Sequence, residues 1–194
     1  MDTSASLLDE LRSPSNEHAW SELVQLYQPL ILGWLRRLGA APSDHDDLAQ
    51  EVFTVVVRRL EEFQRQPRVG AFRAWLRTIT TNCLRNHWKR SGRRPTAKGS
   101  SNFAAILDEL EDPQSGMSQL WDREHDQFVL QHLLKRIQTE FSEKTWSAFQ
   151  GFALQGRPAD QVAEALGMTT NAVFIAKSRV MARLQSCGQG LLDF

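Results

Sequence analysis

The chain has 194 residues with 23 Lys or Arg and 23 Asp or Glu, so it is formally neutral and long enough for one large domain or two small ones. No apolar run approaches the roughly 20 residues of a membrane helix, no signal peptide is visible, and the two cysteines lie outside any Cys/His cluster of zinc spacing. We therefore expect a cytoplasmic protein with no membrane insertion, no cofactor and no structural metal.

Helical periodicity recurs along the chain and strand patterns are almost absent, which predicts an all-α fold. Apolar residues follow a helical stripe over residues 17–38. Pro29 inside that stripe predicts a kink or a break into two helices. Ser43 or Asp44 can cap the next helix, whose first turn carries two further aspartates that suit the helix dipole.

The stretch from Phe63 to Leu107 concentrates positive charge, with ten Lys or Arg and no Asp or Glu. Apolar residues at helical spacing predict a buried face: Phe72, Trp75, Leu76, Ile79 and Cys83. A second, solvent-facing ridge is predicted from residues four apart: Arg73, Arg77, Thr81, Arg85 and Lys89. Stacked like charges repel, so this ridge favours a polyanion opposite. The alternative is a solvated basic face that keeps the protein soluble.

Residues 108–126 reverse the charge, with seven Asp or Glu against Arg123 alone. Pro113 and Gly116 predict a linker here, preceded by a short helix over residues 103–110. An acidic linker could fold back on the basic surface as a weak, salt-sensitive cover. A solubilising spacer is the alternative.

A second helical set begins at Phe128, and the end of the chain has the pattern of a helix-turn-helix. A short helix closes at Gly167, and Thr169 or Thr170 caps a last helix that reaches about residue 185. That helix is basic enough to approach a duplex major groove. The alternative is an ordinary helical hairpin.

Three of these stretches resemble one protein family. They are residues 46–53 (DDLAQEVF), residues 72–90 (FRAWL to NHWKR) and residues 161–169 (QVAEALGMT). Together they resemble the bacterial RNA polymerase sigma factors, specifically the extracytoplasmic-function (ECF) group of the sigma-70 family. The resemblance implies a region 2-like domain over residues 1–95, a linker over 96–126 and a region 4-like helix-turn-helix domain over 127–194.

The resemblance also implies a role for each motif. The first would bind core RNA polymerase at the β′ clamp helices, with the β flap as a further contact, through Asp47, Gln50, Glu51 and Thr54. The second would bind the promoter −10 region through Arg73, Arg77, Thr81, Arg85, Trp88, Lys89 and Arg90. The loop at 64–71 would take up a base extruded from the non-template strand. The third would read the −35 element through Thr170, Asn171, Phe174, Lys177, Ser178, Arg179 and Arg183.

Two departures from the family pattern matter. Asn86 stands where many relatives carry an acidic residue, so a salt bridge made there is lost. The last helix is more apolar at its start than the common pattern. This shifts the expected sequence readout toward four residues: Asn171, Phe174, Ser178 and Arg179.

The leading hypothesis is a sigma factor without catalysis of its own, which binds promoter DNA and core polymerase and assists −10 melting. A stand-alone helix-turn-helix regulator is the main alternative. A metal-dependent nuclease is a third, with Asp44, Asp46, Asp47 and Glu51 as ligands, although no second ligand cluster or general base accompanies them. An anti-sigma partner is left open.

Overall fold

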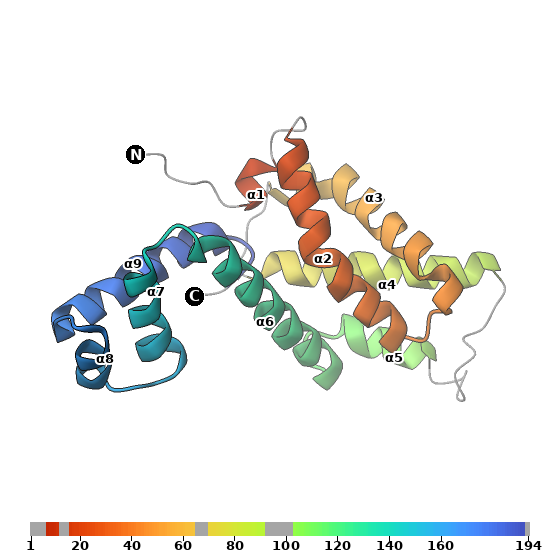
Figure 1. Ribbon diagram of the computed structural model, residues 1–194. Helices are drawn as coiled ribbons and strands as arrows, with labels where there is room; N and C mark the ends of the chain where they lie inside the picture. Colours follow the sequence, from red (N-terminus) through yellow and green to blue (C-terminus); the bar gives the residue numbers. More distant parts are fainter. Residues whose placement is uncertain (1–6, 12–15, 65–69, 92–102, 193–194) are drawn as a thin grey trace.

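The computed structural model describes residues 7–11, 16–64, 70–91 and 103–192 (Figure 1). Helices dominate these residues, with a single isolated β-bridge between Gln189 and Leu192. The prediction of an all-α fold is confirmed. In order, the helices are α1 (Leu7–Glu10), α2 (Glu17–Arg37), α3 (His45–Gln64), α4 (Ala71–Ser91), α5 (Phe103–Glu111), α6 (Gly116–Gln138), α7 (Glu143–Phe149), α8 (Ala159–Leu166) and α9 (Thr170–Gly188).

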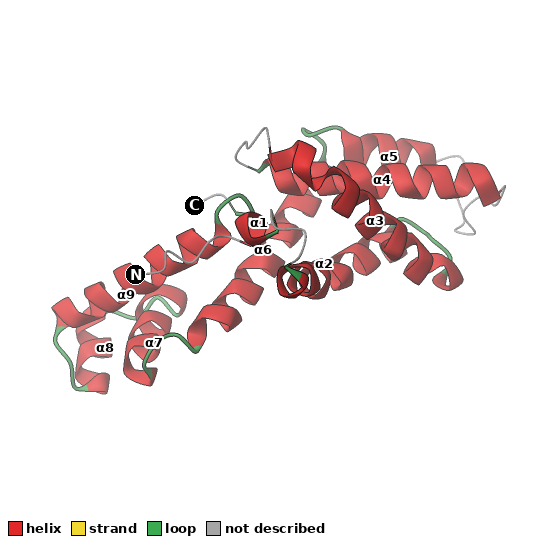
Figure 2. Cartoon of the chain, turned by 90° about the horizontal axis from the view of Figure 1, so that it is seen from above, coloured by secondary structure: helices red, strands yellow, loops and turns green. Residues whose placement is uncertain are grey.

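Helices α2, α3 and α4 pack against one another, and α6 runs across α2 and α4 (Figure 2). The Asn16 side chain caps α2 by accepting a hydrogen bond from the Ala19 backbone at 3.1 Å. Pro29 lies inside α2, and the helix continues through it, so the break that the sequence allowed does not occur. Pro29 is exposed, and water can therefore satisfy the carbonyl that loses its backbone partner.

The apolar face predicted for α4 is confirmed. Phe72, Leu76, Ile79 and Cys83 are buried, and Trp75 is half-buried with its ring stacked on that of Phe63. Burial also raises the pKa of the Cys83 thiol to about 11, so it behaves as a small core residue at neutral pH.

The predicted linker, residues 96–126, contains α5, which agrees with the short helix predicted over residues 103–110, and also the first half of α6, which was not predicted. Ser115 caps α6 by accepting a hydrogen bond from the Ser118 backbone at 3.0 Å. Buried residues then recur at helical spacing down the whole of α6: Ser118, Trp121, His125, Val129, Leu133 and Ile137. One helix therefore crosses position 126, where the sequence divides the linker from the second domain, and the two-domain division stays a proposal.

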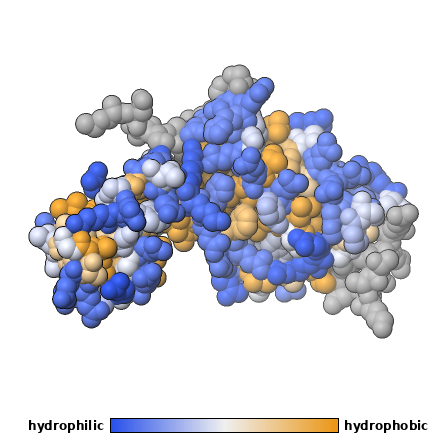
Figure 3. Space-filling view, viewed as in Figure 1, coloured by the Kyte–Doolittle hydropathy of each residue, from blue (hydrophilic) through white to orange (hydrophobic). Residues whose placement is uncertain are grey.

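Helices α7, α8 and α9 form a compact end of the molecule (Figure 1). Ser142 and Thr169 cap α7 and α9 through their side chains, and Thr169 is one of the two caps that the sequence allowed for the last helix. Gly167 ends α8 at a φ of 56°, a left-handed conformation that suits glycine. Figure 3 shows hydrophobic surface at this end, around α8 and the start of α9, where Leu154, Phe174 and Ile175 are exposed.

Candidate polymerase and nucleic-acid interface

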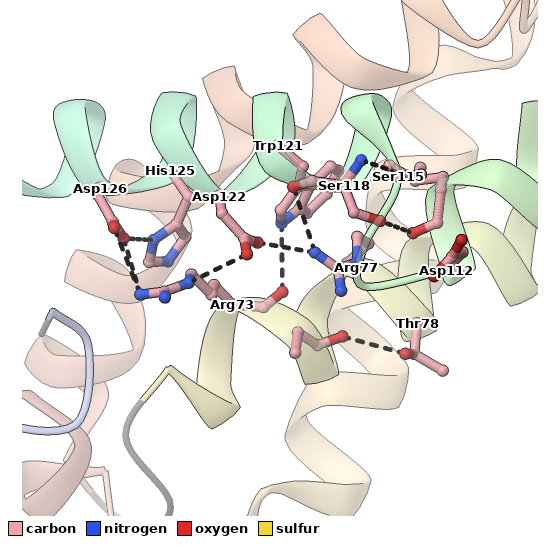
Figure 4. Close-up of polar contacts among 12 residues, drawn as sticks. Arg73, Arg77, Thr78, Asp112, Ser115, Ser118, Trp121, Asp122, His125 and Asp126 are labelled. Carbon is pink, nitrogen blue, oxygen red and sulfur yellow. Dashed lines mark hydrogen bonds and ion pairs between the residues drawn. The ribbon is translucent and has the colours of Figure 1, made fainter.

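The α4 ridge, which we define as Arg73, Arg77, Thr81 and Arg85, faces the protein rather than solvent. Arg77 is 5% exposed and donates to Asp122 on α6 with Nη1 2.7 Å from Oδ1 (Figure 4). The same nitrogen lies 3.4 Å from the backbone oxygen of Ser118. A buried guanidinium keeps its charge only with such partners. Asp122 therefore neutralises the centre of the ridge.

Arg73, one turn earlier, meets two carboxylates of the same helix. Its Nη1 lies 3.3 Å from Asp126 and its Nε 3.6 Å from Asp122. Asp126 also contacts Nδ1 of the buried His125 (Figure 4). The Nε2 atom of His125 lies 3.1 Å from the Tyr27 hydroxyl on α2. Burial first, and the Asp126 charge second, raise the pKa of Tyr27 well above its ordinary value, so its hydroxyl stays protonated. This polar chain ties α6 to both α2 and α4.

The far end of the ridge is held by α5. Arg85 lies 2.8 Å from Glu111 and 3.1 Å from Asp108, and the buried Thr81 hydroxyl lies 3.3 Å from the same Glu111. The hydrogen bond from Arg85 lowers the pKa of Glu111, and the bond in return raises that of Arg85. Asp108 is 73% exposed in its side chain. This end of the contact is therefore more exposed to solvent than the end at Arg77.

The prediction of a solvent-facing ridge is wrong for Arg73, Arg77, Thr81 and Arg85 in this conformation, whereas its last member, Lys89, is exposed. The four residues do share one face of α4, as their spacing requires. Four carboxylates from α5 and α6 occupy that face: Asp108, Glu111, Asp122 and Asp126. The apolar stripes of α5 and α6 pack against the core, and this packing places their acidic residues opposite the cations.

A different face of α4 is open. Its exposed polar residues are Thr78, Asn82, Asn86, Lys89 and Arg90. A cavity of about 420 Å³ between α3 and α4 is lined by Trp75, Thr78, Asn82 and Asn86 together with Arg59 and others. An aromatic ring beside amide groups suits stacking and edge recognition of an unpaired base. The sequence missed this groove because its walls come from two helices.

Of the remaining −10 residues, Trp88 is half-buried and packs against the core. Arg90 is exposed, although its Nη2 lies 2.7 Å from Glu51 on α3. The loop predicted to capture a base falls largely on residues 65–69, which lie outside the described residues.

The polar face predicted on α3 is mostly open. Asp47, Gln50 and Thr54 are exposed, whereas Glu51 is half-buried and paired with Arg90. Val57 is 53% exposed about one turn beyond Thr54. The sequence analysis did not single out this valine. A polar face that ends in an exposed apolar residue is typical of a protein-binding surface.

The start of α9 is also open. The exposed residues among those predicted there are Thr170, Asn171, Phe174, Lys177, Ser178 and Arg179. Arg183 is different, because it is half-buried and its Nη2 donates to Glu140 at 2.7 Å. Glu140 therefore occupies this guanidinium in the free protein, and its contact with DNA stays a prediction. Ile175 and Leu154, both 50% exposed, join this surface and were not predicted.

Comparison with known proteins matches the α2–α4 unit to a family. Residues 23–94 match the family model for Sigma-70 region 2. This part of the chain is similar to region 2 of the sigma-70 family. The chain is 33% identical over 109 residues to the RNA polymerase sigma-H factor of Pseudomonas aeruginosa, covering 53% of this chain and 55% of that protein. It is 31% identical over 91 residues to the ECF RNA polymerase sigma factor SigE of Mycolicibacterium smegmatis, covering 47% of this chain and 34% of that one.

These relatives support an ECF-type member of the sigma-70 family. The chain spans about half the length of the first relative and a third of the second. The region 2 match covers both the α3 face and α4, including all of the ridge. The region 2 match does not support the prediction that α8 and α9 form a helix-turn-helix, because both helices lie beyond residue 94.

Two of the four carboxylates of the nuclease hypothesis have other partners. Asp44 lies 2.9 Å from His87, and Glu51 is paired with Arg90. Among the described residues, no three His, Cys, Asp or Glu side chains gather as a metal site would require. No described helix is long and apolar enough to cross a membrane.

Proposed function

We propose that the protein is a sigma factor that binds core RNA polymerase, directs it to specific promoters and assists opening of the −10 region. The observation that carries this proposal is the match of residues 23–94 to Sigma-70 region 2. The names of the two relatives, both RNA polymerase sigma factors, support the same role. Sigma factors are initiation factors without catalysis of their own, and the protein would act in the cytoplasm alongside the polymerase.

Core polymerase would bind the exposed face of α3. Asp47, Gln50 and Thr54 supply acidic and polar contacts to a basic partner, and Val57 supplies an apolar one. The β′ clamp helices are the partner that the family resemblance implies. An anti-sigma partner and a contact to the β flap stay predictions without a described surface to support them.

Promoter DNA would be bound at two places. The open groove between α3 and α4, with Trp75, Asn82 and Asn86, would hold unpaired bases near −10. Helices α8 and α9 would act as a helix-turn-helix on the −35 element. Lys177 and Arg179 would bind phosphates or guanine there, and Phe174 would give an apolar base contact.

In vitro transcription tests this proposal. Purified core polymerase, the protein and a pool of genomic promoter fragments should give transcripts from a restricted set of start sites. Core polymerase alone should not give them. The absence both of such transcripts and of binding to core polymerase would overturn the proposal.

The α3 face has a test of its own. Gln50→Ala with Val57→Ser should weaken binding to core polymerase about tenfold, or about 1.4 kcal/mol. Both side chains are exposed, so the fold should be unaffected. Glu17→Gln, an exposed change on α2 away from this face, is the control. Equal affinity of the two variants would remove the assigned docking face.

The stand-alone regulator is a second candidate, because α9 is open in the free protein while the α4 ridge is covered. Specific, tight binding to promoter duplex by the protein alone would favour it. If instead sequence-specific binding requires core polymerase, the sigma factor reading holds.

A further inference from the structure

The acidic cover, which we define as residues 103–126 of α5 and α6, holds the cations that DNA would need. Arg73, Arg77 and Arg85 each contact at least one of its carboxylates at 2.7 to 3.6 Å. Carboxylate oxygens bind guanidinium groups with the same charge-assisted geometry as phosphate oxygens. The cover therefore occupies the ridge as a nucleic-acid backbone would.

The two ends of the cover differ in how firmly they are held. At the α6 end Trp121 is fully buried, with its ring 4.8 Å from that of Trp34, and Arg77 is almost inaccessible. At the α5 end Asp108 and Glu111 have side-chain exposures of 73% and 34%. Exposed ion pairs contribute little stability and are screened by salt. The contact therefore has a weak outer part and a strong inner part.

We infer that the acidic cover is an intramolecular competitor of DNA for the α4 ridge, and that it opens from its α5 end when the ridge is used. This inference rests on the proposed function. In the free protein, DNA must displace Asp108 and Glu111 before it reaches Arg85, and Asp122 and Asp126 before it reaches Arg77 and Arg73. The chain then binds DNA through the ridge weakly until another contact, such as polymerase binding, favours the open form.

The two outer pairs, which Asp108 and Glu111 make with Arg85, give the clearest test because their loss should leave the core intact. Asp108→Asn with Glu111→Gln should raise affinity for a fluorescein-labelled forked DNA of mixed sequence about three- to tenfold, measured by fluorescence anisotropy at low salt. The matched control removes the same charge elsewhere: Glu109→Gln with Glu17→Gln, both exposed. Glu109 is on α5 and contacts no ridge cation within the described residues. This control should change affinity less than about twofold.

A third variant ties any gain to the ridge. Adding Arg85→Ala to the Asp108→Asn, Glu111→Gln protein should remove the gain, because the exposed cation is then missing. If the gain survives this addition, or if the control pair gives the same gain, general charge is responsible and the inference fails. No gain in the first variant also overturns it.

The inner pairs, which Asp122 and Asp126 make with Arg77 and Arg73, give a second test. Asp122→Asn with Asp126→Asn should raise affinity more than the outer variant, provided that circular dichroism shows a folded protein. A folded inner variant without a gain would contradict the inference. If it does not fold, the outer variant alone decides.

Transcription separates failure of this inference from failure of the proposed function. Suppose that the wild-type protein supports promoter-specific transcription with core polymerase but the outer variant shows no gain in DNA affinity. Only the inference that the acidic cover competes with DNA is then refuted. If neither protein binds core polymerase or supports transcription, the proposed function fails whatever the DNA affinities are.

Discussion

Helices α4 and α9 are both basic, and both would meet promoter DNA in a sigma factor, yet the cations of the α4 ridge are covered while those in the first turns of α9 face solvent. Arg73, Arg77 and Arg85 on α4 are paired with carboxylates of α5 and α6. Lys177 and Arg179 on α9 are exposed and make no ion pair within the described part of the chain. A cluster of like charges in a sequence therefore indicates a need for an anion, and it does not say whether that anion belongs to the protein.

The difference follows from which segments lie next to each helix. The acidic stretch follows α4 in the chain and packs back on it. No Asp or Glu occurs between Glu164 and Asp193, so α9 has no acid of its own. Its one cation near a carboxylate, Arg183, is held by Glu140 just before α7. The first turns of α9 are left open as a result.

The largest expected effect is on stability and concerns Arg77. Arg77→Ala should lower the free energy of unfolding by about 3 kcal/mol, because it leaves the Asp122 carboxylate without its main partner in a partly buried site. Urea unfolding followed by circular dichroism measures this. Lys89→Ala, an exposed change on the same helix, should cost less than about 0.5 kcal/mol. Equal costs would mean that the α4 ridge is not held as described.

The next effect is on DNA binding by the free protein and concerns α9. Lys177→Ala with Arg179→Ala should lower affinity for duplex DNA about 10- to 100-fold and reduce the salt slope by about 1.8, as expected for the loss of two phosphate contacts. Fluorescence anisotropy over a range of salt concentrations gives both values. An unchanged slope would show that α9 does not contact the backbone.

A smaller effect separates the two helices directly. Arg85→Ala in the otherwise unchanged protein should alter DNA affinity less than about twofold, because the cover already occupies this side chain. The same anisotropy assay measures it. A loss as large as that of the α9 variant would mean that the ridge is open in solution.

The fold class, the buried face of α4 and a threonine cap at the start of α9 could be predicted from the sequence, because they depend on local spacing and capping chemistry. The exposure of the ridge could not. A period of four residues places Arg73, Arg77 and Arg85 on one face but says nothing of what packs there.

The first half of α6 was missed for a related reason. Pro113, Gly116 and the density of charge suggested a linker, although Trp121 and His125 begin the same buried stripe that continues to Ile137. In the same way, the groove between α3 and α4 and the exposed Val57 depend on how helices pack, which single-helix patterns do not report.

The smallest effect is a pH dependence shared by both basic helices. Hydrogen bonds from Arg85 and Arg183 lower the pKa of Glu111 and Glu140 below the ordinary value of 4.5. A lowered native pKa contributes stability above pH 4.5 that is lost as pH falls through the native value. Below this pH, Glu111→Gln should therefore flatten the fall in the free energy of unfolding. The change should be less than about 1 kcal/mol because the pair is partly exposed. Thermal unfolding at a series of pH values tests this, and an unchanged profile would contradict it.

The distance between α4 and α5 tests the central claim most directly. Fluorophores attached after Ser91→Cys and Glu109→Cys would sit on exposed positions of the two helices and outside the proposed binding surfaces, while the native Cys83 and Cys187 are buried. Energy transfer between them should be high in the free protein and should fall when core polymerase and promoter DNA are added. High transfer that persists in an initiating complex would contradict the account, because the cover would then stay on the α4 ridge while the promoter is open.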